Sequence, residues 1–338
     1  MIITLPQPYL LFLGDVTSAR YAKTAFGLRD WAPERCVGEI ALPGTTITTN
    51  LPRLSPLEAY QRGARALVIG VASRGGMLMP SWIPTLVGAL EAGLDIVSGM
   101  HSKLGDQPEI RRAAERLERK LFDIRTPPSD IPIATGRKRS GKRLLTVGTD
   151  CAVGKKYAAL ALARAFRARG VDAEFRATGQ TGILIAGSGV PLDCVVADFV
   201  SGAAETLSPD AAQSHWDIVE GQGSLSHPSY SGVSLGLLHG TQPDVIVVCH
   251  ELGRETLMGL HDFPLPSLEE TIALNLTLAQ RVNPDVRCGG IALNTADVSD
   301  EQARLAIKKY RLQVSLPVAD PMRGGPELDA LVSSCLGG

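Results

Sequence analysis

The chain has 338 residues, more than a single hydrophobic core usually holds, so two domains are expected. Hydrophobic residues make up 44% and charged residues 20%, as in ordinary globular proteins. The net charge of −1 lacks the basic surplus typical of nucleic-acid-binding proteins, and no apolar run is long enough to span a bilayer, so neither nucleic acid nor membrane is expected as a partner.

The N-terminal segment, Met1 to Leu13, does not resemble a signal peptide. No basic residue precedes its apolar residues, and it contains Pro6 and Pro8. The cysteines are scattered singly along the chain, without the paired spacing of zinc sites or disulfide frameworks. These features predict a cytoplasmic location, a reducing compartment.

The first part of the chain alternates strand and helix signals. Alternation of this kind predicts an α/β fold with a parallel sheet. We expect a Rossmann-like domain over residues 1–130, although no G-x-G-x-x-G follows the first strand, so NAD binding is weakly supported. The expected strands cover residues 10–14, 36–40, 66–71, 95–98 and 121–124, and the expected helices 18–28, 56–63, 81–92 and 108–119.

A linker is expected over residues 131–142, in a proline-containing stretch with a basic cluster. The cluster comprises Arg137, Lys138, Arg139, Lys142 and Arg143. Most such clusters are solvated charged segments; the alternative is a contact with a ligand phosphate.

The most informative stretch covers residues 146–156 (TVGTDCAVGKK). A strand leads into a glycine-bounded loop, and an alanine-rich helix follows. Backbone N–H groups in such a loop converge on an anion, and the positive end of the helix adds to the attraction. We therefore expect a phosphate-binding loop composed of Gly148, Thr149, Asp150, Cys151, Ala152, Val153, Gly154, Lys155 and Lys156.

Lys156 departs from the usual P-loop pattern, in which a serine or threonine after the lysine binds Mg²⁺. A second cation stands where that hydroxyl belongs. Phosphate binding is thus better supported than nucleotide hydrolysis, and no metal is expected.

The second part again alternates, which predicts a P-loop domain with a doubly wound parallel sheet over residues 143–338. The expected strands cover residues 144–148, 172–178, 195–198, 218–220, 245–249, 289–294 and 314–318, and the expected helices 155–169, 203–213, 268–281 and 300–310.

Polar residues gather at the ends of these strands, where doubly wound sheets bind ligands. Taken singly, each is as readily a structural turn or cap residue, but the set favours a site. Asp198, Glu220 and His227 are candidates for this site. His227 is equally compatible with a structural role.

Several motifs carry a resemblance to known families. Residues 148–155 and 219–223 resemble dethiobiotin synthetase and its P-loop relatives. Nearly the whole chain more closely resembles the D-glutamate N-acetyltransferase family of the DgcN type. The motifs that carry this second resemblance are residues 177–185 (ATGQTGILI), 197–203 (ADFVSGA), 219–225 (VEGQGSL) and 290–295 (GIALNT).

This resemblance implies acetyl transfer from acetyl-CoA to the amine of D-glutamate. The ammonium group must lose a proton before it attacks the thioester, so Asp198, Glu220 and His227 are candidates for the general base, and N–H groups of the turn 221–224 are candidates for oxyanion donors. A phosphate loop with two lysines then suits the phosphates of CoA without Mg²⁺. Thr178, Gln180, Thr181 and Arg254 are expected to contact the amino acid, with Arg254 pairing its carboxylate. The alternatives are an ATP-dependent ligase or kinase of the dethiobiotin synthetase kind and a non-catalytic nucleotide-sensing module. A homo-oligomer, a dimer, is expected.

Two further features stay open. Cys151 is either an acyl-carrying thiol with a lowered pKa or, more in keeping with its small size, a filler of the loop. Residues 74–76 and 99–103, each after an expected strand of the first domain, either bind substrate or form a subunit contact.

Overall fold

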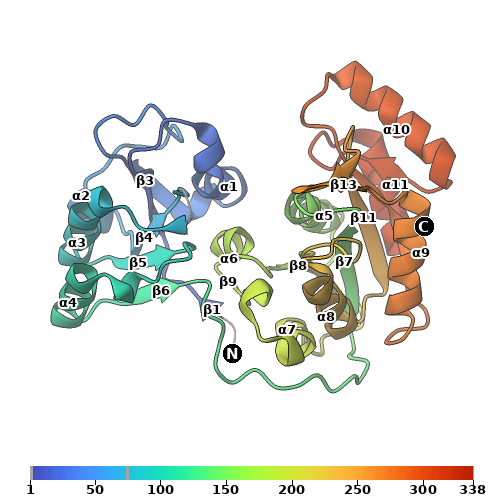
Figure 1. Cartoon of the computed structure of the whole chain (residues 1–338), viewed down its shortest axis with the longest axis horizontal. Coiled ribbons are helices and arrows are strands. Elements are labelled where there is room, and N and C mark those ends of the chain that lie inside the picture. The colour runs from blue at the N-terminus through green and yellow to red at the C-terminus, as the bar shows by residue number, and fades with distance from the viewer. Residues whose placement is uncertain (1–2, 74–75, 338) are drawn as a thin grey trace. The chain divides into compact units, whose positions relative to one another are not determined.

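The computed structural model describes residues 3–73 and 76–337, which form two compact units (Figure 1). The first runs to Pro127 and also includes Gln180–Pro191; we call it the Rossmann-like unit. The second comprises Pro128–Gly179 and the chain from Leu192 onward; we call it the P-loop unit. The boundaries expected from the sequence run linearly along the chain, whereas the first unit takes in a short segment from the second half.

The Rossmann-like unit is built on a five-stranded parallel sheet with the strand order β3-β2-β4-β5-β6. Its central strands are short apolar runs that are buried throughout, as expected for a parallel sheet covered on both faces. The strands are β2 (Tyr9–Phe12), β3 (Cys36–Ile40), β4 (Ala66–Ile69), β5 (Asp95–Ser98) and β6 (Leu121–Asp123).

Helices connect these strands. Proline stands in the first turn of α2, α3 and α4, where its missing N–H costs no hydrogen bond, and Ser55 and Glu58 form a capping box on α2. Helices α1 and α6 contact each other, as do α3 and α4. The helices are α1 (Lys23–Trp31), α2 (Pro56–Gln61), α3 (Ile83–Glu91), α4 (Pro108–Leu117) and α6 (Gln180–Ala186).

Helix α6 and the strand after it belong to the segment Gln180–Pro191, from the second half of the chain. Strand β9 (Ser188–Gly189) pairs antiparallel with β1 (Ile3–Thr4), near the N-terminus. Three consecutive apolar residues of α6, Ile183 to Ile185, are buried, and Arg35 Nη1 donates to the Ile185 carbonyl at 2.8 Å. This segment therefore belongs to the core of the Rossmann-like unit.

The P-loop unit has a six-stranded parallel sheet with the order β15-β14-β11-β7-β10-β8. Strand β7 lies inside the sheet, and the chain continues from it first to one side and later to the other, so its carboxyl end lies at a topological switch point. The strands are β7 (Lys142–Gly148), β8 (Ala173–Arg176), β10 (Trp216–Val219), β11 (Val245–Glu251), β14 (Arg287–Asn294) and β15 (Val318–Ala319), with a separate hairpin of β12 (Thr256–Leu257) and β13 (Leu260–Pro264).

Helices cover both faces of this sheet. Helices α5 and α11 contact each other, and α8 contacts both α7 and α9 (Figure 1). Because parallel crossovers are right-handed, α5, which leads to β8, and α8, which leads in the opposite direction to β11, lie on opposite faces. The helices are α5 (Lys155–Ala168), α7 (Val200–Leu207), α8 (Ser231–Thr241), α9 (Leu268–Ala279), α10 (Asp300–Val314) and α11 (Gly325–Leu336).

The two parallel sheets confirm the predicted fold class. The strand expected over residues 195–198 is wrong, because a 3-10 helix, η7 (Ala197–Phe199), lies there. The strand expected over 314–318 is also misplaced: Val314 ends α10, and β15 begins at Val318. Within the described part of the chain, no helix combines the length and apolarity needed to cross a membrane.

The basic cluster is neither solvated throughout nor placed for a ligand phosphate. The Arg143 side chain is 1% exposed, and its Nε donates to Ser208 Oγ at 2.7 Å. Arg139 is also buried and donates to the carbonyls of Gly240 and Thr241. Arg143 stands near the start of β7, five residues before Gly148, which corresponds to about 16 Å along a strand. Arg139 and Arg143 thus hold together the chain at the amino-terminal edge of the sheet, away from the phosphate loop.

Candidate active site

The phosphate loop, residues 149–154, joins the buried end of β7 to the 14-residue helix α5. Gly154 is the N-cap of α5 with φ of 102°, a left-handed conformation that glycine adopts without strain. The N–H groups of the loop and the positive end of the helix form an anion-binding environment. The predicted strand–loop–helix arrangement is present; binding of the cofactor by residues 148–156 stays a prediction.

Lys155 is buried at the start of α5. Its Nζ donates to the main-chain carbonyl of Asp150 at 2.7 Å, and burial lowers the pKa of the ammonium. The side chain is thereby held against the phosphate loop, where its charge adds to that of the positive end of α5.

Asp150 organises the loop from within. Its carboxylate is fully buried; Oδ1 accepts from the Cys151 N–H at 2.6 Å, and Oδ2 accepts from Arg254 Nη1 at 2.8 Å and from the Met258 N–H at 2.7 Å. Arg254 also pairs with Glu251 and donates to the Cys151 carbonyl. The guanidinium that we expected to hold a substrate carboxylate therefore already clamps the loop.

Glu220 follows β10, as expected, and its side chain is almost fully buried. Its Oε2 accepts from the N–H groups of Thr178 at 3.0 Å and Gly179 at 3.2 Å. Burial raises the pKa of the carboxyl to about 7, although the charge of Lys156 and the two N–H groups act to lower it. A carboxyl group that titrates near neutral pH is well matched to general-base catalysis.

Lys156 also acts on Glu220 through its charge. The hydroxyl that it replaces normally binds Mg²⁺, whereas the charge of Lys156 acts to lower the pKa of the Glu220 carboxyl. Its Nζ also lies over the ring of Tyr157, 4.4 Å from the centroid. Lys156 thus adds a positive charge to the surroundings of Glu220.

The turn after Glu220 is packed directly against β7. A side chain on Gly221 would place its Cβ 1.7 Å from the Thr146 carbonyl, so only glycine fits there. The Gly221 N–H donates to Thr146 Oγ1 at 2.9 Å, which removes it from the oxyanion donors that we expected in this turn. Gln222 Nε2 reaches Thr178 Oγ1 at 3.0 Å, so the structure brings Thr178, Glu220 and Gln222 together.

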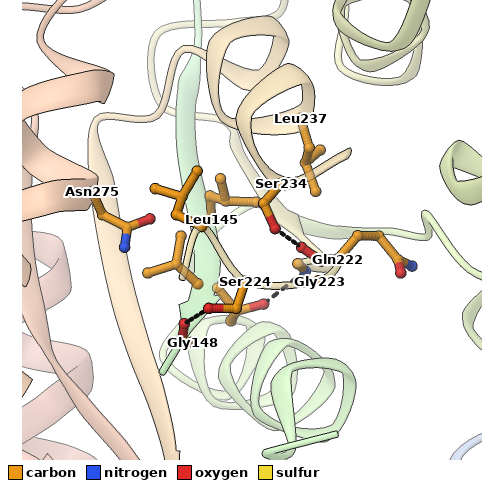
Figure 2. Close-up of a pocket in the computed structure, with 12 residues that line it drawn as sticks. Leu145, Gly148, Gln222, Gly223, Ser224, Ser234, Leu237 and Asn275 are labelled. Carbon is orange, nitrogen blue, oxygen red and sulfur yellow. Dashed lines mark hydrogen bonds between the residues drawn. The ribbon is translucent and has the colours of Figure 1, made fainter. Parts of the chain in front are cut away.

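Figure 2 shows a small cavity behind this turn. Ser224 Oγ donates to the Gly148 carbonyl at 3.1 Å, and Ser234 Oγ donates to the Gln222 carbonyl at 2.6 Å. The cavity measures about 10 Å³, room for a single water molecule. The hydrogen bond from Ser224 fixes the turn against the phosphate loop. The cavity is too small for a substrate.

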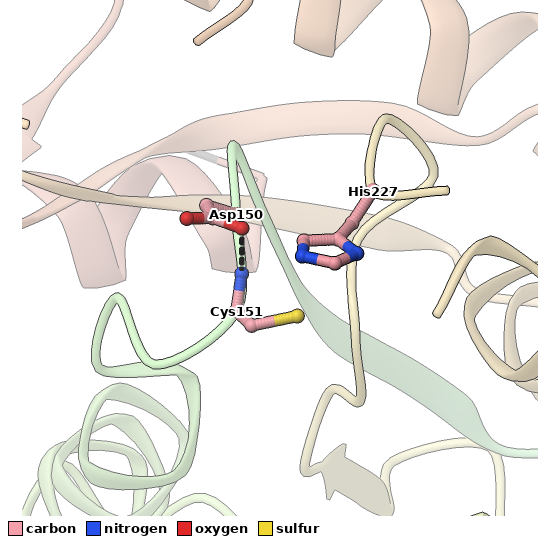
Figure 3. Close-up of side chains that lie close together, drawn as sticks. All are labelled: Asp150, Cys151 and His227. Atoms are coloured by element: carbon pink, nitrogen blue, oxygen red, sulfur yellow. Dashed lines mark hydrogen bonds between the residues drawn. The ribbon is translucent and has the colours of Figure 1, made fainter. Parts of the chain in front are cut away.

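Asp150, Cys151 and His227 converge in a buried cluster (Figure 3). His227 Nδ1 accepts from the Ser229 N–H at 3.2 Å, and Nε2 lies 3.0 Å from the Met258 carbonyl, which identifies Nε2 as the protonated nitrogen. With both ring nitrogens and both Asp150 oxygens engaged by protein groups, the cluster is better satisfied as a hydrogen-bonded network than as a metal site. This environment favours the structural role for His227.

Cys151 does not have the lowered pKa considered above. Burial raises the pKa of its thiol and outweighs the opposing charge of Lys155. A protonated, buried thiol is a weak nucleophile, which favours the filler role.

Asp198 is exposed in η7 rather than at a strand end. Gln180 and Thr181 open α6 and belong to the Rossmann-like unit, and Thr181 Oγ1 lies 3.4 Å from Thr24 Oγ1 of α1. The expected site residues thus fall into three environments: a buried set around Glu220, the exposed Asp198, and the start of α6.

His250, at the end of β11, contacts the phosphate loop. Its Nδ1 lies 3.1 Å from Thr149 Oγ1 in the phosphate loop, and its Nε2 lies 3.3 Å from the Tyr310 hydroxyl. Burial and the charge of Arg254 lower the pKa of His250 to about 4, so the ring is neutral at pH 7. The register that aligns Cys249 of β11 with Gly148 of β7 produces this contact, and the sequence contains no signal for register.

Comparison with known families identifies both parts of the chain. Residues 34–127 match the DUF1611_N Rossmann-like domain of unknown function, and residues 132–332 match the DUF1611_C P-loop domain of unknown function. A crystal structure of a DUF1611 family protein from Anabaena variabilis is similar with a TM-score of 0.85 and 31% sequence identity, covering 98% of this chain and 100% of that one.

Two curated proteins are similar over almost their whole length. A D-glutamate N-acetyltransferase from a Pseudoalteromonas species is 50% identical over 327 residues, 97% of this chain and 98% of that protein. A D-glutamate N-acetyltransferase from Tritonibacter scottomollicae is 51% identical over 318 residues, 94% of this chain and 96% of that protein.

Proposed function

This chain belongs to the DUF1611 family, and we propose that it is an N-acetyltransferase that moves the acetyl group of acetyl-CoA to the amino group of D-glutamate. Two relatives with this activity in their names, each about half identical to the chain over at least 94% of its length, support the reaction. The structural observation that carries the proposal is the buried Glu220, whose pKa of about 7 suits removal of a proton from an amine.

In the proposed reaction, Glu220 takes a proton from the ammonium group of the amino acid. The freed nitrogen attacks the thioester carbonyl carbon, a C–N bond forms, and the C–S bond breaks. The CoA thiolate leaves and takes up the second proton of the nitrogen, so the products are the N-acetylated amino acid and free CoA. Asp198 and His227 stay as alternative bases, but the first is exposed and the second has both ring nitrogens engaged.

The phosphate loop is proposed to hold the phosphates of CoA. Its N–H groups, the start of α5 and Lys155 supply positive potential without a metal. Lys156 is proposed to add to that potential and to keep a fraction of Glu220 ionised at neutral pH, since its charge opposes the effect of burial on the pKa.

We expect acetyl transfer to persist in excess chelator, because Lys156 replaces the hydroxyl that binds Mg²⁺ in ordinary P-loops. Initial rates with and without EDTA, on enzyme dialysed against the chelator, give the measurement. A rate that collapses in EDTA and returns with added Mg²⁺ would contradict this account of the loop.

The function is tested by a panel of amino acids with acetyl-CoA, followed by thiol release, beside an ATP-turnover assay. Thiol release with D-glutamate, at a higher kcat/KM than with L-glutamate or D-aspartate, is the expected result. ATP turnover that depends on an acceptor would instead identify a ligase or kinase of the dethiobiotin synthetase kind. Tight nucleotide binding without turnover would identify a sensing module.

We further propose a homodimer in the cytoplasm, and the domain limits 1–130 and 143–338 with a linker over 131–142. In the part of the chain that the structure describes, Cys36, Cys151, Cys249, Cys288 and Cys335 form no disulfide, which suits a reducing compartment. Light scattering on the purified protein gives the oligomeric state directly.

A further inference from the structure

Thr149 opens the phosphate loop, which is described in full, unlike residues 74–75, also considered above for ligand binding, which lie outside the described residues. Each polar group of Thr149 is engaged by the protein. Its N–H donates to the Cys249 carbonyl at 3.1 Å, its carbonyl accepts from Ser224 Oγ at 3.2 Å, and its Oγ1 lies 3.1 Å from His250 Nδ1. Since Thr149 is also fully buried, the protein alone sets the course of the chain at this residue.

His250 connects Thr149 to helix α10. Its Nε2 lies 3.3 Å from the hydroxyl of Tyr310, and the two rings meet edge to face with their centroids 5.5 Å apart. His250 itself is buried, whereas Tyr310 is half-buried. A neutral imidazole has one N–H donor and one acceptor nitrogen, so the directions of its two hydrogen bonds are coupled.

The burial of Thr149 decides these directions. Its hydroxyl hydrogen cannot reach water, and His250 Nδ1 is an acceptor at hydrogen-bond distance. Nε2 then carries the ring proton and donates to the oxygen of Tyr310, whose own hydrogen turns toward solvent. In the opposite arrangement, Nδ1–H would donate to Thr149 Oγ1 and leave a buried hydroxyl hydrogen without an acceptor among the described residues, which is unfavourable.

We propose that His250 is a positioning residue for the phosphates of CoA, because it accepts the hydrogen of Thr149 and so fixes the first residue of the phosphate loop. This inference rests on the proposed function and deepens it, since the loop is proposed to hold those phosphates. Thr149 then acts by shaping the loop, and the N–H groups at the start of α5 face the anion. A loop that already has its bound shape loses less conformational entropy when the ligand binds.

Two variants of His250 separate hydrogen bonding from packing. The amide of asparagine reaches about as far as Nδ1 and that of glutamine about as far as Nε2, so only His250→Asn can still accept from Thr149. A neutral hydrogen bond corresponds to a roughly 2- to 12-fold change in affinity. His250→Gln should therefore weaken CoA binding and raise KM for acetyl-CoA by this factor and keep kcat, while His250→Asn should bind CoA nearly as wild type does. A packing role predicts the reverse order, because glutamine is closer to histidine in size.

A double variant shows whether His250 acts through Thr149. In Thr149→Val the hydroxyl is absent, so His250→Gln should weaken CoA binding no further, and effects that simply add would overturn the inference. The proton–nitrogen correlations of the His250 ring in NMR should show Nδ1 without a proton; a proton on Nδ1 would contradict the assigned directions. His261→Gln, which changes an exposed histidine of β13, is the matched control and should bind CoA as wild type does.

Calorimetric titration with CoA and with ATP, beside the thiol-release assay, separates this inference from the proposed function. If the wild type acetylates D-glutamate and both His250 variants bind CoA equally well, the inference fails alone. If CoA binds wild type and His250→Asn more tightly than His250→Gln but no thiol is released, the proposed function fails and the inference stands. A wild type that binds ATP and not CoA would overturn both.

Discussion

Replacing Glu220 with glutamine should lower kcat for acetyl transfer by about 10²–10⁴-fold, the usual contribution of a general base. Glutamine keeps the size of the side chain, and its carbonyl oxygen can still accept from the N–H groups of Thr178 and Gly179, but it cannot take up the proton. Wild-type kcat should rise with pH through about 7, where the Glu220 carboxyl ionises, and the variant should lack this rise.

The same variant gives a stability measurement with a defined sign. Burial raises the pKa of Glu220 to about 7 from 4.5, so protonation stabilises the native state, and this stabilisation is lost as the pH rises through 7. A shift of this size corresponds to roughly 3 kcal/mol. The free energy of unfolding of Glu220→Gln minus that of the wild type should therefore increase as the pH rises from about 4.5 to 7.

Asp198→Asn and His227→Asn are the comparisons, each removing one candidate base; only the first keeps the shape of the side chain. We expect Asp198→Asn to keep near-normal kcat, because the side chain is exposed. His227→Asn should affect stability more than chemistry, since it breaks contacts with main-chain atoms of Ser229 and Met258. If Glu220→Gln stays active and one of the others collapses, the base is that other residue.

Replacing Lys155 with alanine should weaken acetyl-CoA binding roughly 10- to 150-fold, because a charge-assisted phosphate contact contributes about 1.5–3 kcal/mol. Its Nζ is held in the phosphate loop by the Asp150 carbonyl. Calorimetric titration with CoA gives the affinity. Lys309→Ala, which removes an exposed lysine of α10, is the matched control and should bind CoA as wild type does.

Acetylpantetheine, which carries the thioester but no phosphate, separates a phosphate contact from damage to the loop. Turnover of this compound should be nearly unaffected by Lys155→Ala. A distorted site would instead lower the turnover of acetylpantetheine and of acetyl-CoA alike. An unchanged CoA affinity together with a lost ATP affinity would favour the ligase alternative.

Features with a local signal were predictable from the sequence. The residues that define an apolar strand, or the glycines and lysines of the phosphate loop, are close together in the sequence. Strands β3 and β5 and the start of α5 lie where the sequence predicts them. The apolar run before Asp198 wrongly predicted a strand, because tertiary context places a 3-10 helix there. Helix α8 was missed because its serines and glycines are weak helix formers.

Features that depend on distant segments were out of reach. The contact of Thr149 with His250 follows from strand register, which the hydrophobic pattern of two fully buried strands does not specify. The raised pKa of Glu220 depends on burial by neighbouring turns rather than on its own sequence. The contact between α1 and α6 joins segments more than 150 positions apart, as Thr24 and Thr181 are.

The placement of Gln180–Pro191 in the Rossmann-like unit limits how this protein can be rearranged in evolution. A gene fragment ending at residue 130 would lose α6, and with it the partner of α1, while the complementary fragment would carry the buried side chains of Ile183, Leu184 and Ile185 without the surface that covers them. Neither half can be exchanged with an unrelated partner by one recombination event in the linker.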